Sequence, residues 1–458
     1  MNNNLTRSLA LFLSMLWIGQ CMASNTDPKD SFSLQDAISY ALEHNPELRK
    51  ARMDVSISKE TVKQTVAIGL PQISATGSYS HYLTIPGNWI KNFAPTPGSP
   101  EYIFLQFQQK INSSGTIGVN QLLFDGSYLV GLKATKEFVD MSRFLEAKTA
   151  YDVQVNVSKA YLMIASTDLN IKLINANIKT LEKSLSDLKA MFEEGFVEDL
   201  DVKRVQLSLN NILIQKETLS KAREAFIELL KVQMGMDLTH KLFLKDDIES
   251  IDRQIRLEEE IGKAVWTPIS RPEYQILDQS IRLGKLDKKR YQMGYLPKLV
   301  GFYQHQQSTM RPEFNFFESN LTPNNNWIPS DMLGLQVQLT LFDGLQAQSK
   351  IREIQYKIDK AETDLEAFSN AASVEWRNAR NNYQLQLKQA ALQKENMDLA
   401  EEIYNKTQIK FKEGVGSTLE ITQAEGEFKS AQVNYLNAIY DLVLAKIDYH
   451  KAIGKPIK

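Results

Sequence analysis

Long stretches of regularly spaced apolar residues dominate the pattern of this chain. Between Gly126 and Gly195 only Gly131 interrupts the sequence, and apolar side chains recur at alternating steps of three and four. These side chains are Ile171, Ile174, Ile178, Leu181, Leu185, Leu188 and Phe192. The same alternation runs from Ile421 to Ala452. It is typical of a coiled-coil seam, and a helix of about 66 residues would be roughly 100 Å long. On periodicity alone a rod-like coiled coil is the simplest interpretation.

A second pattern, strict alternation of apolar and polar residues, predicts strands. From Met332 to Phe342 leucines and a valine alternate with glycine, glutamine and threonine, over the length that a tilted membrane-spanning strand needs. Three further strands are expected at 72–83, 116–124 and 298–310. Glycine, serine and glutamine on the second face favour a water-filled lumen, although each strand taken alone also fits a soluble hairpin packed on a helix.

The segments between the paired strands are rich in proline, asparagine and aromatic residues. The aromatic residues are Trp89, Phe93, Tyr102, Phe314, Phe316, Phe317 and Trp327. Aromatic side chains at strand ends are typical of a belt at a membrane interface. Four strands in one chain are too few to close a barrel, and lipid does not tolerate an open sheet edge. We therefore expect several chains to associate.

The chain repeats itself, which predicts two internal structural repeats. HNPEL around Pro46 returns as SRPEY around Pro272 at a shift of 226, and QLLFDG returns as LTLFDG at a shift of 218. Repeat 1 is expected over 24–248, with a strand hairpin at 72–125 and a helix pair that turns near residue 195. Repeat 2 is expected over 249–458, with a hairpin at 298–342 and a turn near residue 414. Ser33 and Asp36 predict a capping box, and Pro46 a first helical turn.

The composition narrows the possible functions. The 458 residues are 43% hydrophobic and 24% charged with a net charge of −2, which argues against disorder and against nucleic-acid binding. Residues 1–23 combine Arg7, an apolar run and small residues, and are expected to be a signal peptide. The only cysteine, Cys21, follows a glutamine, which disfavours lipidation, so the mature chain is expected to lack cysteine. No later segment has 18 uninterrupted apolar residues, as a spanning helix would need.

Nothing in the sequence indicates catalysis. The histidines have no metal-ligand spacing: His44, His81, His240, His305 and His450. Common hydrolase, metalloprotease and nucleotide-binding motifs are missing. We expect no catalytic residue, no cofactor and no metal.

Together these features resemble the TolC-like outer-membrane factor family of Gram-negative bacteria, across essentially the whole mature chain. The resemblance is carried by SLQDAISYALEHNPELRKAR, by the FDG joints ending at Gly126 and Gly344, and by the turns FEEGFVEDLDV and FKEGVGSTLEITQAE. It implies an α+β membrane protein: a homotrimer that shares one outer-membrane β-barrel, with four strands from each chain. A long α-helical coiled-coil tunnel would continue the barrel through the periplasm.

The resemblance places the closed, adaptor-facing end of the tunnel at the two helix-to-helix turns. The implied adaptor contacts are Glu194, Gly195, Phe196, Glu413, Gly414 and Val415. Both glycines stand where a chain that leaves a helix needs a left-handed residue, and a plain helix stop explains them equally well.

The resemblance also implies a gate. Glu420 matches an acidic ring that narrows the pore, and three copies would keep the local potential negative. Gln423 is neutral where a second acid often stands, so we expect one acidic ring. Asp201 matches an acid that latches the closed state, but the usual tyrosine and arginine partners are replaced by Phe411 and Gly416, which offer neither a side-chain hydrogen bond nor a charge. Solvated acids near helix starts are the plainer alternative for Asp201 and Glu420.

The expected function is therefore the exit duct of a tripartite efflux pump for small molecules. Its expected partners are outer-membrane lipid, a periplasmic adaptor protein and an inner-membrane RND or ABC pump. The alternatives are the exit duct of a type I protein secretion system, and a periplasmic coiled-coil scaffold that forms no channel.

Overall fold

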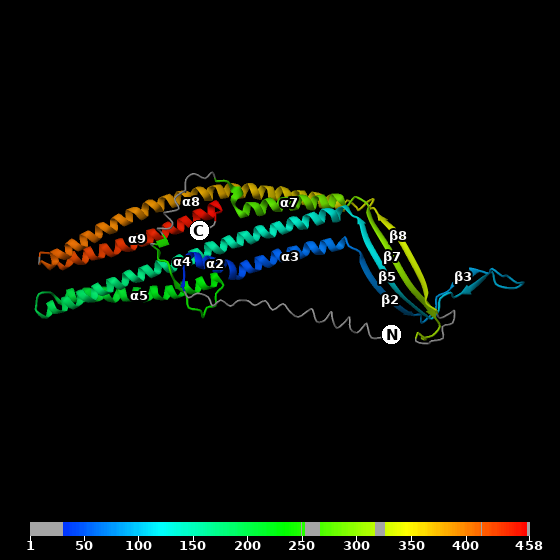
Figure 1. The fold of residues 1–458 in the computed structure, drawn as a ribbon, viewed down its shortest axis with the longest axis horizontal. Helices are drawn as coiled ribbons and strands as arrows, with labels where there is room; N and C mark the ends of the chain where they lie inside the picture. Colours follow the sequence, from blue (N-terminus) through cyan, green and yellow to red (C-terminus); the bar gives the residue numbers. More distant parts are fainter. Residues whose placement is uncertain (1–30, 249, 252–265, 317–325, 414, 456–458) are drawn as a thin grey trace, which may run out of the picture.

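The molecule is elongated, with helices along most of its length and a sheet at one end (Figure 1). The computed structural model describes residues 31–248, 250–251, 266–316, 326–413 and 415–455. The expected signal peptide with Cys21, as well as Phe317 and Gly414, lies outside the described residues. The helices of the described part are α2 (Leu34–His44), α3 (Pro46–Ile68), α4 (Gly126–Glu193), α5 (Asp199–Met234), η1 (Pro268–Ser270), α7 (Pro272–Met293), α8 (Gln346–Lys412) and α9 (Thr418–Ile453).

The ends of the helices follow local sequence signals. The Ser33 hydroxyl accepts the Asp36 N–H at 3.1 Å, and the Asp36 carboxylate accepts the Ser33 N–H, so the expected capping box is confirmed. Pro46 opens α3 as expected. The unbroken stretch after Gly126 forms α4 with 68 residues, and α8 has 67. None of the helices in the described ranges is long and apolar enough to cross a membrane.

The strands divide into one large sheet and two small pairs. They are β1 (Ser31–Phe32), β2 (Gln72–His81), β3 (Asn88–Lys91), β4 (Tyr102–Leu105), β5 (Ile111–Phe124), β6 (Phe243–Leu244), β7 (Lys298–Arg311) and β8 (Ile328–Gln338). The large sheet has the order β2-β5-β7-β8 and is antiparallel throughout. Its outer strands β2 and β8 each have a neighbour on one side within the chain, so the sheet is open.

Several strand bounds differ from the sequence-based expectation: β8 begins at Ile328 rather than at residue 332, and β2 ends at His81 rather than at residue 83. We expected a strand at 332–342, but β8 ends at Gln338 because its last partner is Lys298, the first residue of β7. Residues 339–342 therefore continue the apolar alternation without being a strand. β5 begins at Ile111 rather than at residue 116, because its first residues pair with β2 and β7. The strand expected at 298–310 is confirmed to within one residue.

The chain between β2 and β5 forms an additional hairpin from β3 and β4. It projects beyond the far end of the large sheet (Figure 1). Trp89 on β3 and Phe104 on β4 pack together with ring centroids 5.4 Å apart. The corresponding connection between β7 and β8 is shorter, from residue 312 to residue 327.

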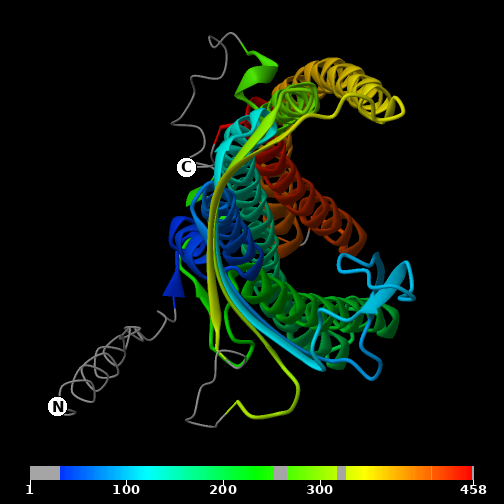
Figure 2. The same ribbon diagram turned by 90° about the vertical axis from the view of Figure 1, so that its right-hand side faces the viewer.

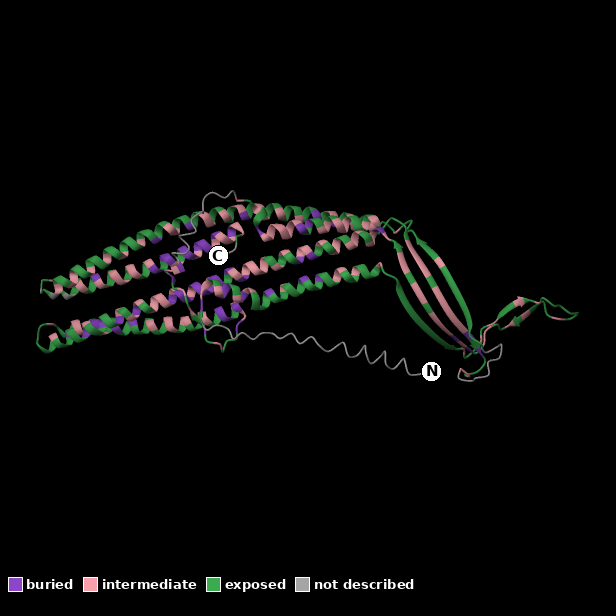
Figure 3. Ribbon diagram, in the orientation of Figure 1, coloured by how far each residue is buried: buried purple, intermediate pink, exposed green. Residues whose placement is uncertain are grey.

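The apolar seam predicted for the long helices forms a core. Ile174, Ile178, Leu181, Leu185 and Leu188 are buried against α5, as expected for a coiled coil. The seam of α9 packs against α8 in the same way through Ala438, Leu442, Ala445 and Tyr449. A larger core surrounds Tyr161, where α2, α4 and the end of α5 meet. Figure 3 shows buried residues concentrated among the helices, whereas β2 and β8 are exposed along almost their whole length.

Candidate functional site

The turn between α4 and α5 lies at the end of the molecule farthest from the sheet (Figure 1). Gly195 has φ of +79°, a left-handed conformation that strains residues with a Cβ atom, as expected from the sequence. The Phe196 N–H donates to the Met191 carbonyl at 2.8 Å and so closes the last helical turn. Glu194 is exposed, and the Phe196 side chain is 76% exposed. The turn therefore presents a phenylalanine and a carboxylate to its surroundings.

The turn between α8 and α9 lies at the same end and is also compact. The N–H groups of Val415 and Gly416 both donate to the Lys410 carbonyl at 3.1 Å. A Cβ atom on Gly416 would lie 3.0 Å from the Phe411 nitrogen, so this turn favours glycine. Val415 is 78% exposed, and Glu413 is exposed too. Both turns thus carry a bulky apolar side chain next to an acidic residue.

Glu420 lies in the first turn of α9. Its N–H donates to the Ser417 hydroxyl at 3.2 Å, which caps the helix, and its side chain is exposed. One turn on, the Gln423 amide donates to the Glu427 carboxylate at 3.1 Å. Glu420 is thus exposed in the single chain, and its role in a gate stays a prediction.

Asp201, for which the resemblance implies a latch, has a partner in its own helix. The Arg204 guanidinium lies 3.5 Å from the Asp201 carboxylate, of which 19% is exposed. At the other turn, Phe411 is half-buried and Gly416 has no side chain, so neither supplies the tyrosine hydroxyl or the guanidinium of the latch that the resemblance implies. Its Arg204 contact gives Asp201 a local electrostatic role within α5 in the single chain.

The lateral edges of the molecule form a second candidate surface. Toward the turns, the helices pack in the order α5, α4, α9, α8, so α5 and α8 are the edges. Each edge helix carries leucine or isoleucine residues every seven positions that point away from its partner and are exposed: Leu200, Leu207 and Ile214 on α5, and Leu385, Leu392 and Leu399 on α8. We call these two sets the edge stripes.

The same edges continue toward the sheet. There α3 packs on α4, and α8 packs on α7, which leaves exposed Met53 and Ile57 on α3 and exposed Tyr356 on α8. Beyond them lie the open strands β2 and β8. Seen toward the sheet end, the chain forms a curved layer that is open on one side (Figure 2). The N-terminal half supplies one open edge at every level, and the C-terminal half supplies the other.

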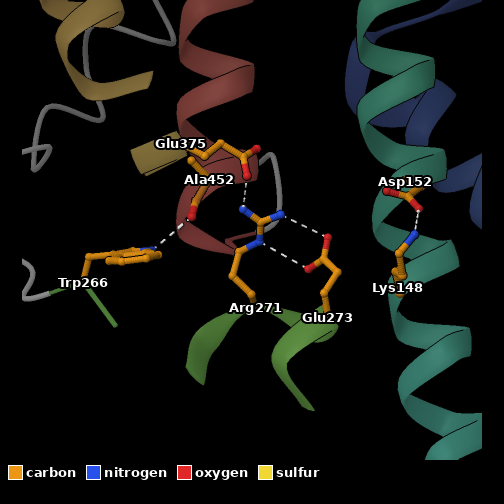
Figure 4. A network of polar contacts seen from close by, with 7 residues as sticks. All are labelled: Lys148, Asp152, Trp266, Arg271, Glu273, Glu375 and Ala452. Carbon is orange, nitrogen blue, oxygen red and sulfur yellow. Dashed lines mark hydrogen bonds and ion pairs between the residues drawn. The ribbon is translucent and has the colours of Figure 1, made fainter. Parts of the chain in front are cut away.

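A buried charged network lies where α7 begins, and the sequence did not reveal it. The Arg271 guanidinium donates two hydrogen bonds to Glu273, at 3.1 and 3.2 Å, and one to Glu375 of α8 at 2.8 Å (Figure 4). Only 5% of the Arg271 side chain is exposed. Nearby, the Trp266 indole donates to the Ala452 carbonyl at 3.0 Å and stacks on Trp376.

The network sets the charge state of its members. Burial raises the pKa of Glu273, but the hydrogen bonds and the positive charge of Arg271, together with a backbone hydrogen bond, hold the pKa below its ordinary value of 4.5. Burial likewise lowers the pKa of Arg271, and its two carboxylate partners more than compensate and raise the pKa. Lys148 of α4 also lowers the pKa of Glu273. Arg271 and Glu273 are therefore both charged at neutral pH.

A difference between the two sequence repeats indicates this network. Arg271 precedes Pro272 as Asn45 precedes Pro46. Asn45 caps α3 by accepting the Glu47 N–H at 2.9 Å, and its amide donates to the Gln233 carbonyl at 2.7 Å. Arg271 is too long to cap a helix in this way and instead reaches α8. The difference between asparagine and arginine at matching positions pointed to a different contact in the second half.

Among the described residues, no group of three or more histidine, cysteine, aspartate or glutamate side chains is arranged to hold a metal ion. The arrangement instead suits an assembly of several chains, with long helices, open edges and exposed turns.

The chain matches the family model described as outer membrane efflux protein over residues 37–230 and 290–455. It is 20% identical over 436 residues to the outer membrane protein TolC of Vibrio cholerae serotype O1, covering 92% of this chain and 90% of that protein. It is 18% identical over 449 residues to TolC of Escherichia coli K12, covering 95% and 85%.

Solved structures share the fold. The channel protein CusC matches with a TM-score of 0.74 and 13% identity over 92% of each chain. The outer membrane channel CmeC of Campylobacter jejuni matches with a TM-score of 0.72 and 14% identity, covering 92% of this chain and 85% of that one. The open state of the MtrE outer membrane channel of Neisseria gonorrhoeae gives 0.70 and 16%, covering 93% and 89%.

Proposed function

Because the chain belongs to the outer membrane efflux protein family, and is thus an outer-membrane protein, we propose that three copies close into a channel-tunnel that serves as the exit duct of a tripartite efflux pump for small molecules. The observation that carries the proposal is the pair of open edges that runs the length of the molecule. At every level one edge comes from the N-terminal half and the other from the C-terminal half.

Edges of two different kinds favour a ring. A contact between one edge and the opposite edge of the next copy is heterologous, and it closes into a ring when the rotation between copies fits. In the sheet, β2 and β8 run in opposite directions, because the strand direction reverses at each of the three antiparallel pairs β2–β5, β5–β7 and β7–β8. β8 of one copy thus has the right direction to pair with β2 of the next and to satisfy both open edges.

The helices support the same closure. The edge stripe of α5 and the edge stripe of α8 both repeat every seven residues, as in a coiled-coil seam. Packing one stripe on the other in the next copy would bury leucines and isoleucines that a single chain leaves exposed. The wall of the tunnel would then be continuous from the sheet to the turns.

This assembly assigns a role to each end. The sheet would cross the outer membrane as part of a shared barrel, and the helices would extend into the periplasm. The exposed turns around Phe196 and Val415 would meet a periplasmic adaptor, which would connect the duct to an inner-membrane RND or ABC pump. Glu420 would line the narrow end of the pore.

Measurements of trimer formation, of conductance and of crosslinking at the edges test the proposal. Outer-membrane fractions are expected to contain heat-resistant trimers that conduct ions in planar lipid bilayers. A soluble, elongated periplasmic protein without conductance would instead support the scaffold function. For the edges, a photo-crosslinking residue at position 207 or 392 should join neighbouring copies, whereas the exposed position 208, on another side of α5, should not.

In-cell photo-crosslinking from positions 196 and 415 tests the role of the turns. Capture of a periplasmic adaptor, identified by mass spectrometry, would support docking at this end. The pump that accompanies the adaptor then separates small-molecule efflux from protein secretion. If control positions on the sheet crosslink normally and neither turn captures an adaptor, the assignment of the turns is wrong.

A further inference from the structure

One face of the large sheet changes its chemistry along its height. On β8 this face carries Leu333, Leu335 and Val337, whose cross-strand partners on β7 are Tyr303, Gly301 and Leu299. In the row of Leu333 it continues with Val119 on β5 and Ile73 on β2. These rows lie in the half of the sheet next to the helices. Under the proposed function, this apolar face is the one that contacts lipid, since the opposite face, although it includes Val300, Phe302 and Met332, carries mostly serine, threonine, asparagine and glutamine.

The next row on the same face is charged. Asp331 lies next to Leu333 on this face of β8, two residues earlier in the chain and farther from the helices, and its cross-strand partner is His305. The Tyr303 hydroxyl donates to Asp331 Oδ1 at 2.7 Å, and His305 Nδ1 lies 2.8 Å from the same oxygen. Gln307 Nε2 lies 3.3 Å from His305 Nε2, so an imidazole that is protonated on Nδ1 satisfies both contacts. We call Tyr303, His305, Gln307 and Asp331 the boundary cluster.

A carboxylate on this face does not suit hydrocarbon. Charged side chains on the lipid-facing side of a barrel are unfavourable at the middle of the membrane and are tolerated near its surfaces. The Asp331 side chain is 58% exposed, so its contacts with Tyr303 and His305 do not remove it from its surroundings. Tyr303 has its ring in the last apolar row and its hydroxyl on Asp331, as expected for a tyrosine at a membrane interface. The boundary cluster therefore lies at headgroup level.

Aromatic rings lie above the boundary cluster on the same side. Tyr79 of β2 shares this face, and it contacts Phe314 and Phe316 with ring centroids 6.3 Å away. Phe316 also contacts Trp327. Phe314 and Trp327 are exposed, so their rings are accessible from the outside.

The boundary cluster and the aromatic rings above it suit the binding of sugars better than the binding of phosphates. Carboxylate and amide oxygens accept hydrogen bonds from hydroxyl groups, and aromatic rings cover the apolar C–H face of a sugar ring. Arg311, on the same face, is 1% exposed, bonded to Asn315 and stacked on Phe316, so it does not offer its charge to a phosphate from the lipid.

We propose that the boundary cluster and the aromatic rings above it bind the sugar headgroup of a glycolipid in the outer leaflet of the membrane. The proposal rests on the proposed function, which sets this face toward lipid. Asp331 accepts sugar hydroxyl groups through Oδ2, since its contacts with Tyr303 and His305 both use Oδ1. His305 and Tyr303 hold the carboxylate in place, and the neighbouring apolar rows contact the acyl chains.

The test measures binding of deep-rough lipopolysaccharide to purified protein in detergent. Asp331→Leu removes the acceptor and introduces an apolar side chain that lipid tolerates, and we expect about tenfold weaker binding, the cost of one hydrogen bond to a charged group. The matched control is Ser330→Leu, which introduces the same leucine at the adjacent residue, whose side chain is on the other face. The control should bind like the unchanged protein. Phosphatidylglycerol, which has a phosphate but no sugar, should not distinguish Asp331→Leu from the unchanged protein.

The outcomes separate this inference from the proposed function. Each preparation is also tested for trimers and for conductance in planar bilayers. If the unchanged protein forms conducting trimers and Asp331→Leu binds lipopolysaccharide equally well, the headgroup site is wrong and the channel stands. An equal loss in Asp331→Leu and Ser330→Leu would also overturn the site. If the unchanged protein neither forms trimers nor conducts, the proposed function fails.

Discussion

The Arg271 guanidinium donates a hydrogen bond of 2.8 Å from Nη1 to Oε2 of Glu375, 104 residues further along the chain. This contact connects the start of α7 to the middle of α8, while Glu273 holds the other side of the same guanidinium. α8 is also an edge of the single chain, and in the proposed ring this edge contacts the next copy. Arg271 therefore helps to fix the position of a helix that the next copy would contact.

Removing Arg271 should destabilise the chain. In Arg271→Ala, Glu273 and Glu375 lose their shared cation, and we expect a loss of about 2–3 kcal/mol. This lies at or below the lower end of the usual range for a broken buried pair, because Glu375 is half exposed and can be hydrated. Thermal unfolding followed by circular dichroism should show a lower melting temperature.

Arg282→Ala is the matched control on the same helix. Arg282 pairs with Asp278 one turn away, and its side chain is 63% exposed, so its loss should change stability by less than about 0.5 kcal/mol. Equal effects of the two substitutions would show that the buried network adds nothing to a surface ion pair.

The contribution of Arg271 to the stability of the folded chain should depend on pH. The pKa of Glu273 is lowered in the folded protein, so its stabilising effect is complete above its ordinary value of 4.5 and is lost as the pH falls below that value toward the folded pKa. The difference in melting temperature between the unchanged protein and Arg271→Gln should therefore be largest near neutral pH and shrink on acidification. A difference that stays constant down to about pH 3 would contradict the assignment.

The edge stripes should control assembly without controlling the fold of one chain. Leu392 of α8 and Leu207 of α5 are more than half exposed in the single chain, so Leu392→Glu or Leu207→Glu should leave its helix content unchanged. In the ring each would place three charges in apolar contacts, which is strongly unfavourable. Light scattering after size-exclusion chromatography should show loss of the trimer, and Ser208→Glu, on another side of α5, should retain it.

Much of the fold was predictable because the signals are local. The seam from Ile174 to Leu188 follows from periodicity, and the start of α2 follows from Ser33 and Asp36, three residues apart. The end of β8 was not predictable in this way. Leu339 and Leu341 continue the alternation, but a strand ends where its partner does, and β7 begins at Lys298.

The missed features depend on residues that are distant in the sequence. Nothing near Arg271 indicates that Glu375 will reach it, and the boundary cluster needs the register of β7 against β8. For the gate, Glu420 and Asp201 were singled out by resemblance, and a single chain leaves their roles as predictions.

The β3–β4 hairpin should be removable. The Gln106 amide donates to the Ile85 carbonyl at 2.8 Å, so the two ends of the hairpin already meet. The Tyr82 N–H, which donates to the Lys110 carbonyl at 2.8 Å, continues the pairing of β2 and β5 below it. Replacing residues 87–105 by a short glycine-serine linker should therefore leave helix content and heat resistance of the trimer unchanged. Loss of the trimer would show that the hairpin takes part in assembly.

Glu420 should set the ion selectivity of the assembled channel. In the first turn of α9 its side chain is exposed, and three copies around the pore would attract cations and repel anions. Glu420→Gln should therefore lower the ratio of potassium to chloride permeability, measured from reversal potentials across a salt gradient in planar bilayers. Gln423→Glu, which adds a second ring one turn further, should raise that ratio. Glu402→Gln is the control, because Glu402 lies on α8 and is paired with Lys406, so a charge elsewhere on the helices should leave selectivity unchanged. If Glu420→Gln and Glu402→Gln give the same permeability ratio as the unchanged protein, Glu420 does not line the constriction.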